Sequence, residues 1–254
     1  MPVGVKIVAR VRFAYLPAVI LFLFVTAHCF DINIHLRYKL LHVIIYSIGM
    51  QELDAIFYIL ILLMSVVIHE VAHGFAAEKL GDPTARIAGR LTLNPIKHLD
   101  PIGSVLIPLL LVISNTGFIF GWAKPVPYNP NNLRDKKWGT VFVASAGVLA
   151  NLTLAVIFSV VIRVLSISGI FSSSFVAVLG AVVLVNLVLF IFNLIPIPPL
   201  DGSKILFALL PAKYRNIEIF MERYALPILI LFIVFLWKYV SPLLLWLFAT
   251  LTGF

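Results

Sequence analysis

The sequence predicts an all-α membrane protein that crosses the bilayer several times. Of its 254 residues, 62% are hydrophobic and only 12% are charged, and the mean hydropathy is +1.09. A soluble domain is about half apolar and about a quarter charged, so a soluble fold of this composition would lack the polar residues that cover its exterior. Disordered chains are poor in apolar residues, which excludes disorder. The remaining class is a polytopic membrane protein, whose surface lies largely in lipid.

Six apolar runs approach or reach the length of about 20 helical residues that spans the hydrocarbon core. No period of 20 to 50 residues repeats along the chain, which argues against a solenoid. The first run follows three basic residues and has no small-x-small cleavage site after it, so a signal anchor or first span is favoured over a signal peptide. We therefore expect about five to six hydrophobic segments, at residues 13–30, 55–77, 102–120, 141–165, 175–197 and 226–251.

The run at 102–120 is expected either to cross the membrane or to re-enter on the same side. Positive loops stay in the cytoplasm, and basic residues lie on both sides of this run. A re-entrant hairpin places both loops in the cytoplasm, and Gly103 and Pro108 suit one, while the length of the run also permits a full crossing. The flanking basic residues are Lys79, Arg86, Arg90 and Lys97 before the run and Lys124, Arg134, Lys136 and Lys137 after it.

The net charge of +8 is interpreted in the same way. The basic residues lie in short loops between apolar runs, where they set topology and attract anionic headgroups. The sequence contains no basic patch interleaved with aromatic residues of the kind that binds the phosphate backbone of a nucleic acid. The sequence therefore predicts the lipid bilayer as a partner, and no nucleic acid.

Three ionisable residues lie inside the second apolar run, in the order His69, Glu70, His73. Positions i and i+4 of a helix share one face, with Cβ atoms about 6 Å apart, so both imidazoles can reach one Zn²⁺. Glu70 projects about 100° away from His69 and can reach a water at the metal. That geometry explains why H-E-x-x-H recurs in zinc hydrolases with the glutamate as general base. Ionisable residues at bilayer depth are costly, which also favours a functional site.

Two histidines leave a tetrahedral zinc short of a third protein ligand. Asp201 is the best candidate, because the prolines before it break the helix and Gly202 frees the backbone to aim the carboxylate inward. Spacing alone leaves an alternative open, in which Asp201 caps the helix expected at 203–210. Competing carboxylates are Asp100, Glu78 and Asp54.

The His69–His73 run inside an apolar segment, together with the stretch at 193–202 that ends in Asp201 and Gly202, resembles the site-2 protease family of intramembrane zinc metalloproteases. The resemblance includes residues 121–127 and 144–151, covers about residues 53–211, and is greatest to short prokaryotic members without PDZ or CBS domains. It implies one Zn²⁺ per chain held by His69, His73 and Asp201, with Glu70 as catalytic base. It also implies that Asn151 holds the substrate or the oxyanion.

The resemblance divides the chain into two parts. Residues 50–254 are expected to form the intramembrane metalloprotease domain. Residues 1–49 lie outside the resemblance and are either an extension with an extra span or an upstream start that the cell does not use. The expected location is the cell membrane of a prokaryote, with multiple spans and the active site toward the cytoplasm.

Two loop features have alternative interpretations. Residues 122–128 contain prolines that suit an extended edge, onto which an unwound substrate could add as a strand, or they form a rigid interfacial loop anchored by Trp122 and Tyr128. His98 either faces the substrate or supports the site, or it is a structural histidine of its loop.

The predicted activity is hydrolysis of peptide bonds in or near transmembrane segments of membrane-protein or peptide substrates. A divalent-metal transporter is the first alternative, but it would predict several ligand clusters or inverted repeats. A scaffold that binds membrane proteins without cleaving them is the second, but it would have no physical need for Glu70 between two histidines.

Overall fold

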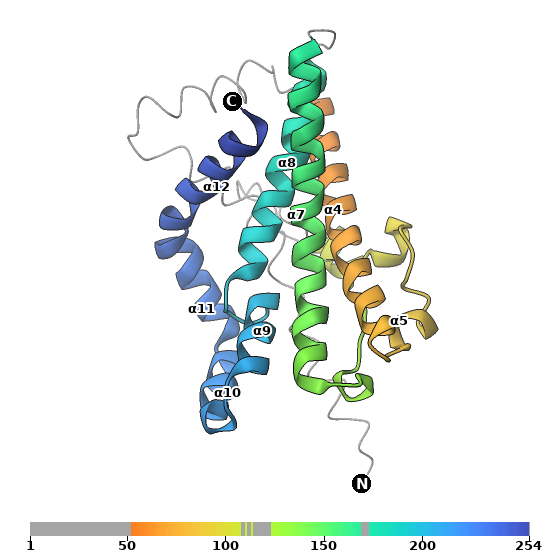
Figure 1. Cartoon of the computed structure of the whole chain (residues 1–254), viewed down its shortest axis with the longest axis vertical. Helices are drawn as coiled ribbons and strands as arrows, with labels where there is room; N and C mark the ends of the chain where they lie inside the picture. Colours follow the sequence, from red (N-terminus) through yellow and green to blue (C-terminus); the bar gives the residue numbers. More distant parts are fainter. Residues whose placement is uncertain (1–51, 108–109, 111–112, 114–122, 169–172, 254) are drawn as a thin grey trace.

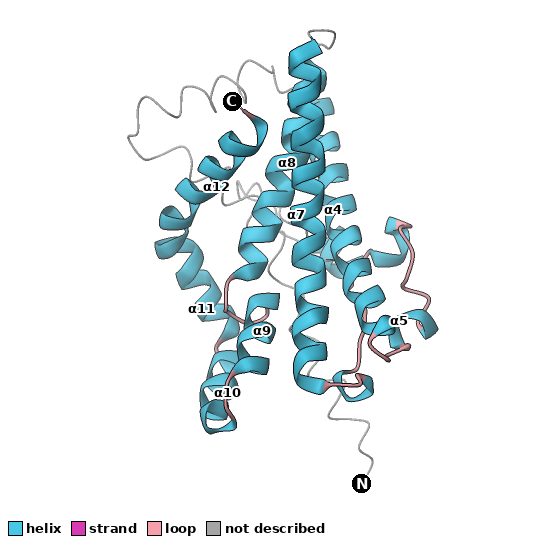
Figure 2. Ribbon diagram, viewed as in Figure 1, coloured by secondary structure: helices cyan, strands magenta, loops and turns pink. Residues whose placement is uncertain are grey.

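The computed structural model describes residues 52–107, 110, 113, 123–168 and 173–253 (Figure 1). These residues are predominantly helical, and they contain no β-strand (Figure 2). Four helical segments are long and apolar enough to cross a membrane, at Phe57–Lys79, Lys136–Ile167, Phe175–Leu194 and Ala225–Thr252. The predicted class of an all-α polytopic membrane protein is therefore confirmed.

Four of the six predicted apolar runs correspond to these helices, and the other two are described in part or not at all. The run at 13–30, like the whole of residues 1–49, lies outside the described residues. The run at 102–120 is described mainly at its start, where Pro101–Leu106 form the π-helical turn η2. Whether that run crosses the membrane therefore stays a prediction.

Helix α4 (Glu52–Lys79) carries the histidine pair, and its C-terminus is capped by a motif that contains Gly81. Gly81 adopts a φ of +113°, which favours glycine over residues with a side chain. Its N–H donates to the carbonyl of Glu78, and the N–H of Asp82 donates to the carbonyl of Ala77. These two bonds form a Schellman motif, which satisfies the last carbonyls of the helix.

Helix α7 (Lys136–Ser168) is the longest helix of the described structure and packs against both α4 and α8 (Ser173–Leu194). Asp135 caps it, because its Oδ1 accepts a hydrogen bond from the Trp138 N–H at 2.9 Å. The chain ascends α7 and returns along α8, so the two helices are antiparallel neighbours (Figure 1).

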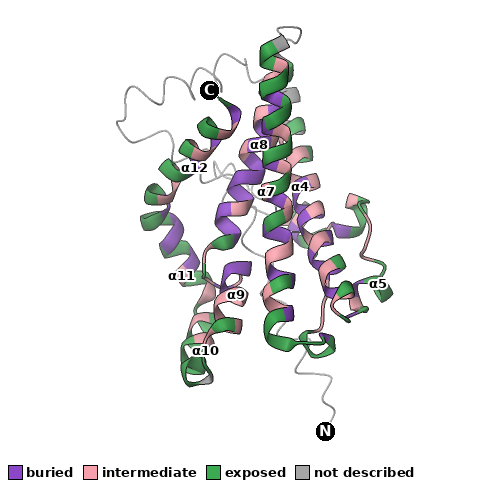
Figure 3. Cartoon of the chain, in the orientation of Figure 1, coloured by how far each residue is buried: buried purple, intermediate pink, exposed green. Residues whose placement is uncertain are grey.

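The C-terminal span is built from α11 (Ala225–Leu231), η5 (Phe232–Leu236) and α12 (Trp237–Thr252). Its inner face packs on α8 through Phe192 and Trp237, whose rings lie 6.1 Å apart. The outer faces of the helices remain exposed (Figure 3). On α7, this exposed face is apolar, as in a helix that contacts lipid, and includes Leu149, Val156, Val160 and Val164.

The turn between α8 and α9 (Asp201–Leu209) brings the start of α9 back against the end of α8. Pro196, Pro198 and Pro199 prevent α8 from continuing. A Cβ at Gly202 would lie 2.2 Å from the carbonyl oxygen of Leu194 and 2.5 Å from that of Ile195, so only glycine permits this approach. Glycine at this position thereby places the neighbouring Asp201.

Short elements connect the long helices. They are α5 (Thr84–Ile87), η1 (Pro95–His98), η3 (Pro130–Asn132), η4 (Ala212–Tyr214) and α10 (Arg215–Arg223). The extended edge predicted at 122–128 is described from Ala123 onward. A single bridge joins Ala123 to Leu99 and the rest of the segment is an irregular loop, so the strand itself is not established.

Candidate metal centre

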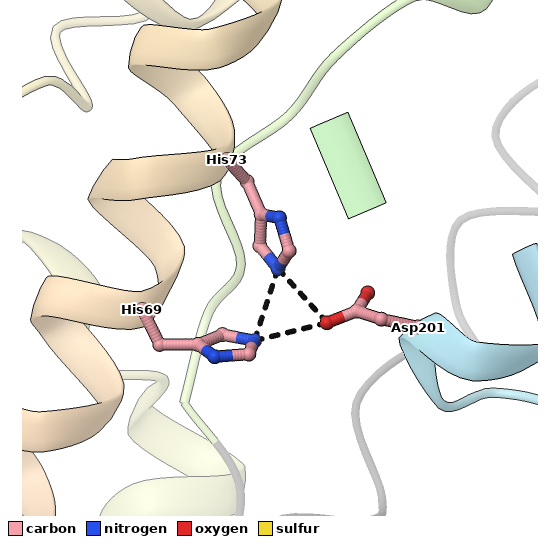
Figure 4. A group of neighbouring side chains, drawn as sticks. All are labelled: His69, His73 and Asp201. Atoms are coloured by element: carbon pink, nitrogen blue, oxygen red, sulfur yellow. Dashed lines mark hydrogen bonds and ion pairs between the residues drawn. The ribbon is translucent and has the colours of Figure 1, made fainter. Parts of the chain in front are cut away.

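The two histidines of α4 face the interior of the helix bundle, one turn apart. His69 and His73 are buried, and their Nε2 atoms lie 2.9 Å apart (Figure 4). The i, i+4 spacing on one helix explains why the two rings meet.

Asp201 completes a triangle of donor atoms. Its Oδ2 lies 3.0 Å from the Nε2 atoms of both His69 and His73, and the side chain points at the two rings from the start of α9 (Figure 4). Asp201 is the first residue of α9, and its carboxylate contacts His69, His73 and Lys204. The inward orientation is therefore the one that the structure adopts, rather than the capping alternative.

Both imidazoles are oriented through their other ring nitrogen. The Nδ1–H of His73 donates to the carbonyl oxygen of Val143 at 2.7 Å, and the Nδ1–H of His69 donates to Oδ1 of Asn151 at 2.6 Å. A neutral imidazole that donates through Nδ1 carries its lone pair on Nε2. Two imidazole lone pairs and a carboxylate oxygen thus face one another, which is unfavourable unless they share a cation.

The spacing of the three atoms also fits a divalent metal. Ligands that each lie about 2.0–2.1 Å from a tetrahedral ion are about 3.3 Å from each other, and the three observed separations are 2.9–3.0 Å. All three residues are buried, and they are the one group of His, Cys, Asp or Glu residues in the described part of the chain that meets this criterion.

Helix α7 approaches the imidazoles closely at a glycine. A Cβ at Gly147 would lie 2.5 Å from Nε2 of His73 and 2.8 Å from Cε1 of His69. Any side chain at position 147 would therefore occupy the space beside the donor atoms.

Lys204 supports the carboxylate from the other side. One turn further along α9, its Nζ donates to Oδ1 of Asp201 at 2.8 Å. The Lys204 ammonium forms an ion pair with this buried carboxyl group and favours its ionised form. Asp201 is therefore a carboxylate, with Oδ2 turned toward the histidines.

Glu70 is held beside the cluster by the loop that precedes α7. Its Oε2 accepts a hydrogen bond from the backbone N–H of Val126 at 2.9 Å. This contact fixes residues 123–128 against α4. Sequence reasoning did not identify it, because a backbone donor leaves no signal in the sequence.

Asn151 lies behind the cluster, and its amide is already bonded at both ends. The side chain is fully buried, Oδ1 accepts from His69, and Nδ2 donates to Oδ1 of Asn186 at 2.9 Å. Asn186 and Ser65 belong to the same polar group, and sequence reasoning did not single them out.

The competing residues lie elsewhere in the structure. Asp100 caps η2 through the N–H groups of Ile102 and Gly103, and Glu78 pairs with Arg86. The backbone of Asp54 belongs to α4. His98 is buried and its Nε2 donates a hydrogen bond to the carbonyl oxygen of Thr92, and none of the described residues forms a hydrogen bond with its Nδ1.

The fold and the cluster together define a class, namely a helical membrane protein with a buried three-donor site that fits a divalent metal. Comparison with known proteins assigns the family. The model of peptidase family M50 matches residues 162–236. No solved structure matches the chain.

Several proteins named as zinc metalloproteases are similar to this chain. A Bacillus subtilis protein named "Putative zinc metalloprotease YwhC" is 40% identical over 190 residues, which are 73% of this chain and 80% of that protein. "Putative zinc metalloprotease Rip2" of Mycolicibacterium smegmatis is 37% identical over 143 residues, 55% of this chain and 52% of that protein. "Zinc metalloprotease MJ0392" of Methanocaldococcus jannaschii is 27% identical over 194 residues, 74% of this chain and 44% of that protein.

The chain belongs to peptidase family M50, the site-2 protease family, and it is a metalloprotease.

Proposed function

We propose that this chain is a zinc metalloprotease that cleaves membrane-protein substrates in or near their transmembrane segments. The observation that carries the proposal is the triangle formed by His69, His73 and Asp201, buried among helices that are long and apolar enough to cross a membrane. The relatives named as zinc metalloproteases support zinc as the metal.

The donor set favours zinc on chemical grounds. Two imidazoles and one carboxylate are a ligand set of catalytic zinc sites, in which a fourth position stays open. When bound, zinc supplies Lewis acidity and lowers the pKa of a water toward neutrality. Lys204 keeps Oδ2 of Asp201 directed at the site by binding Oδ1.

Glu70 is the proposed general base. Its carboxylate takes a proton from the attacking water and returns the proton to the amine that leaves when the peptide bond breaks. The N–H of Val126 holds Oε2 at a fixed place beside the histidines. A base must lie within hydrogen-bond reach of the proton it takes, so we expect this contact to contribute to positioning.

The substrate must be partly unwound before it is cut, because a transmembrane helix uses its carbonyl groups in its own hydrogen bonds. The loop at 123–128 contacts Glu70 through the N–H of Val126 and remains our candidate for the edge that receives such a segment. The expected location is a prokaryotic cell membrane, with the site toward the cytoplasmic side.

Replacement of Glu70 by glutamine tests the proposed activity. The purified full-length protein and Glu70→Gln would be compared for zinc content and for cleavage of a model substrate with a single transmembrane segment. We expect the variant to keep its zinc and to lose at least about 99% of the cleavage rate, because general acid–base catalysis contributes about 10²–10⁴-fold. Cleavage at the wild-type rate by Glu70→Gln would contradict the proposal.

A further inference from the structure

We propose that Asn186 sets which nitrogen of His69 carries the proton, acting through Asn151. Asn186 is a positioning residue that makes Nε2 of His69 available to a metal. This inference rests on the proposed function, because it concerns the same site.

The residues form a continuous chain of hydrogen bonds across three helices. His69 of α4 donates to Oδ1 of Asn151 of α7 at 2.6 Å, and Nδ2 of Asn151 donates to Oδ1 of Asn186 of α8 at 2.9 Å. Nδ2 of Asn186 donates to the carbonyl oxygen of Val182 and to Oγ of Ser65, both at 2.9 Å. Asn151 and Asn186 are fully buried, and Ser65 is 4% exposed.

The orientation of both asparagine amide groups follows from the contact of Asn186 with Val182. The carbonyl oxygen of Val182 can only accept, so Asn186 must present its NH₂ group there. Oδ1 of Asn186 therefore faces Asn151, and Asn151 must meet it with its own NH₂ group. A second, longer bond of 3.4 Å from this group to the carbonyl oxygen of Ser65 points the same way.

The consequence reaches the metal site. With its NH₂ group directed at Asn186, Asn151 can offer only an oxygen to His69, and His69 must therefore carry its proton on Nδ1. Its Nε2 is then an unprotonated atom that faces Nε2 of His73 and Oδ2 of Asp201. A reversed Asn151 amide would present N–H to His69 and place the imidazole proton on Nε2, where it prevents metal binding.

We call the chain of hydrogen bonds from His69 through Asn151 to Asn186 the relay. The described residues around Asn186 favour the orientation of the amide groups given above. Asn186 and Ser65 border a groove between α4, α7 and α8 whose other lining residues are apolar, among them Met64, Leu154 and Phe158. Among the described residues that line the groove, Ser65 and Val182 are the hydrogen-bond partners of Asn186 and the others are apolar.

His73 provides an internal contrast. Its Nδ1–H donates directly to the backbone carbonyl of Val143, which can only accept, so its tautomer does not depend on any side chain. Of the two histidines of the cluster, the relay therefore serves His69, whose Nδ1 partner is a side chain and not a backbone carbonyl. Partners that orient a ligating histidine typically contribute about 10–100-fold to metal affinity.

Two substitutions at position 186 separate direction from packing. Asn186→Leu keeps the volume and removes the acceptor, so the Asn151 amide is free to reverse. Asn186→Asp keeps an acceptor toward Asn151 but places a carboxyl group in a buried position. If Asn186 contributed only by packing, Asn186→Leu would weaken zinc binding less than Asn186→Asp. If Asn186 orients the Asn151 amide, Asn186→Asp should weaken zinc binding less than Asn186→Leu.

Zinc affinity of the full-length holoprotein would be measured by chelator competition, alongside thermal stability and the visible spectrum of the cobalt-substituted protein. We expect Asn186→Leu to bind zinc about 10-fold more weakly and Asn151→Leu about 10–100-fold more weakly. The zinc affinity of Asn186→Asp should stay within about threefold of the wild-type value, and its cobalt spectrum should be unchanged, because the aspartate still offers an oxygen acceptor to Nδ2 of Asn151.

A double substitution makes the coupling explicit. Asn151→Asp presents an oxygen to His69 whatever Asn186 does, so adding Asn186→Leu to Asn151→Asp should cause no further loss of zinc affinity. An equal loss from Asn186→Leu in both backgrounds would overturn the relay. Wild-type affinity in Asn186→Leu, or weaker binding in Asn186→Asp than in Asn186→Leu, would also overturn it. Failure of the wild-type protein to bind zinc would instead overturn the proposed function, and the relay with it.

Discussion

At the scale of single residues, the approach of α7 to the histidines depends on the absence of a side chain at Gly147. Replacing a helical glycine by alanine normally favours the helix by about 1 kcal/mol. Here the added methyl group would lie 2.5 Å from Nε2 of His73. We predict that Gly147→Ala displaces the imidazole and weakens zinc binding by at least about 10-fold, in the range seen when groups that support metal ligands are altered.

Gly180 of α8 supplies the matched control. Among the described residues, a Cβ at this position would meet Cζ of Phe248 alone, at an ordinary contact distance of 3.8 Å. Gly180→Ala should therefore keep the zinc content and the melting temperature of the wild type or raise the latter slightly. Equal zinc affinities for Gly147→Ala and Gly180→Ala would show that the close approach at Gly147 does not matter to the site.

The sequence predicts some of the site residues and not others, for reasons that lie in local geometry. His69, Glu70 and His73 follow from the periodicity of one helix, which needs no knowledge of tertiary structure. For Asp201, spacing alone left a capping role open, because spacing cannot show which way a residue at a helix start turns, and only the family resemblance assigned it to the metal. Asn186 could not be found, since its role depends on how α4, α7 and α8 meet.

At the scale of elements, Asp82 joins the loop after α4 to the turn before α7. Its carboxylate is fully buried and accepts hydrogen bonds from Thr84, from the N–H of Asn129 and from Nδ2 of Asn132, the last at 2.8 Å. Asp82→Asn would place an NH₂ group against one of these donors. We predict a loss of about 1.5–3 kcal/mol of stability, the usual contribution of hydrogen bonds to a charged group, seen as a lower melting temperature in detergent.

The effect of Asp82 should depend on pH. Burial alone would raise the pKa of this carboxyl, but the hydrogen bonds from Thr84, Asn129 and Asn132 hold it below its ordinary value. A folded-state pKa below the unfolded value gives stability that is complete above about pH 4 and is lost as the pH falls through the folded-state pKa. The difference in melting temperature between wild type and Asp82→Asn should therefore be full at pH 7 and shrink below about pH 4. A difference that grows toward acid pH would contradict this assignment.

Elements were predictable where composition alone determines them. Long apolar runs specify α4, α7, α8 and the C-terminal span, and the proline cluster specifies where α8 ends. The arrangement around Asp82 was not predicted, because it joins residues that lie about 50 positions apart in the sequence through backbone and amide donors.

At the scale of the whole molecule, the basic connections gather at one end. Helix α5, the start of α7, and helices α9 and α10 lie toward the same end (Figure 1), and these elements carry Arg86, Lys136, Lys204 and Arg215. Because positive segments stay in the cytoplasm, we predict that this end faces the cytoplasm and that the α7–α8 connection faces the opposite side.

Cysteine labelling tests this orientation. The single native cysteine, Cys29, would be replaced by serine, and single cysteines would be introduced at Ile87 and Ile167, which are 81% and 87% exposed. An impermeant maleimide should label position 167 in intact cells and position 87 only after the membrane is opened. The reverse pattern would contradict the predicted orientation.

The central claim is that one zinc ion, held by His69, His73 and Asp201, is required for peptide-bond cleavage by this chain. The most direct measurement is to remove metal from the purified protein with a chelator and to restore zinc in steps while following cleavage of a single-span substrate. We predict that cleavage disappears on removal and returns in full at one zinc per chain, whereas Asp201→Ala stays inactive at the same zinc concentration. Undiminished cleavage by the metal-free protein, or full recovery of Asp201→Ala, would contradict the claim.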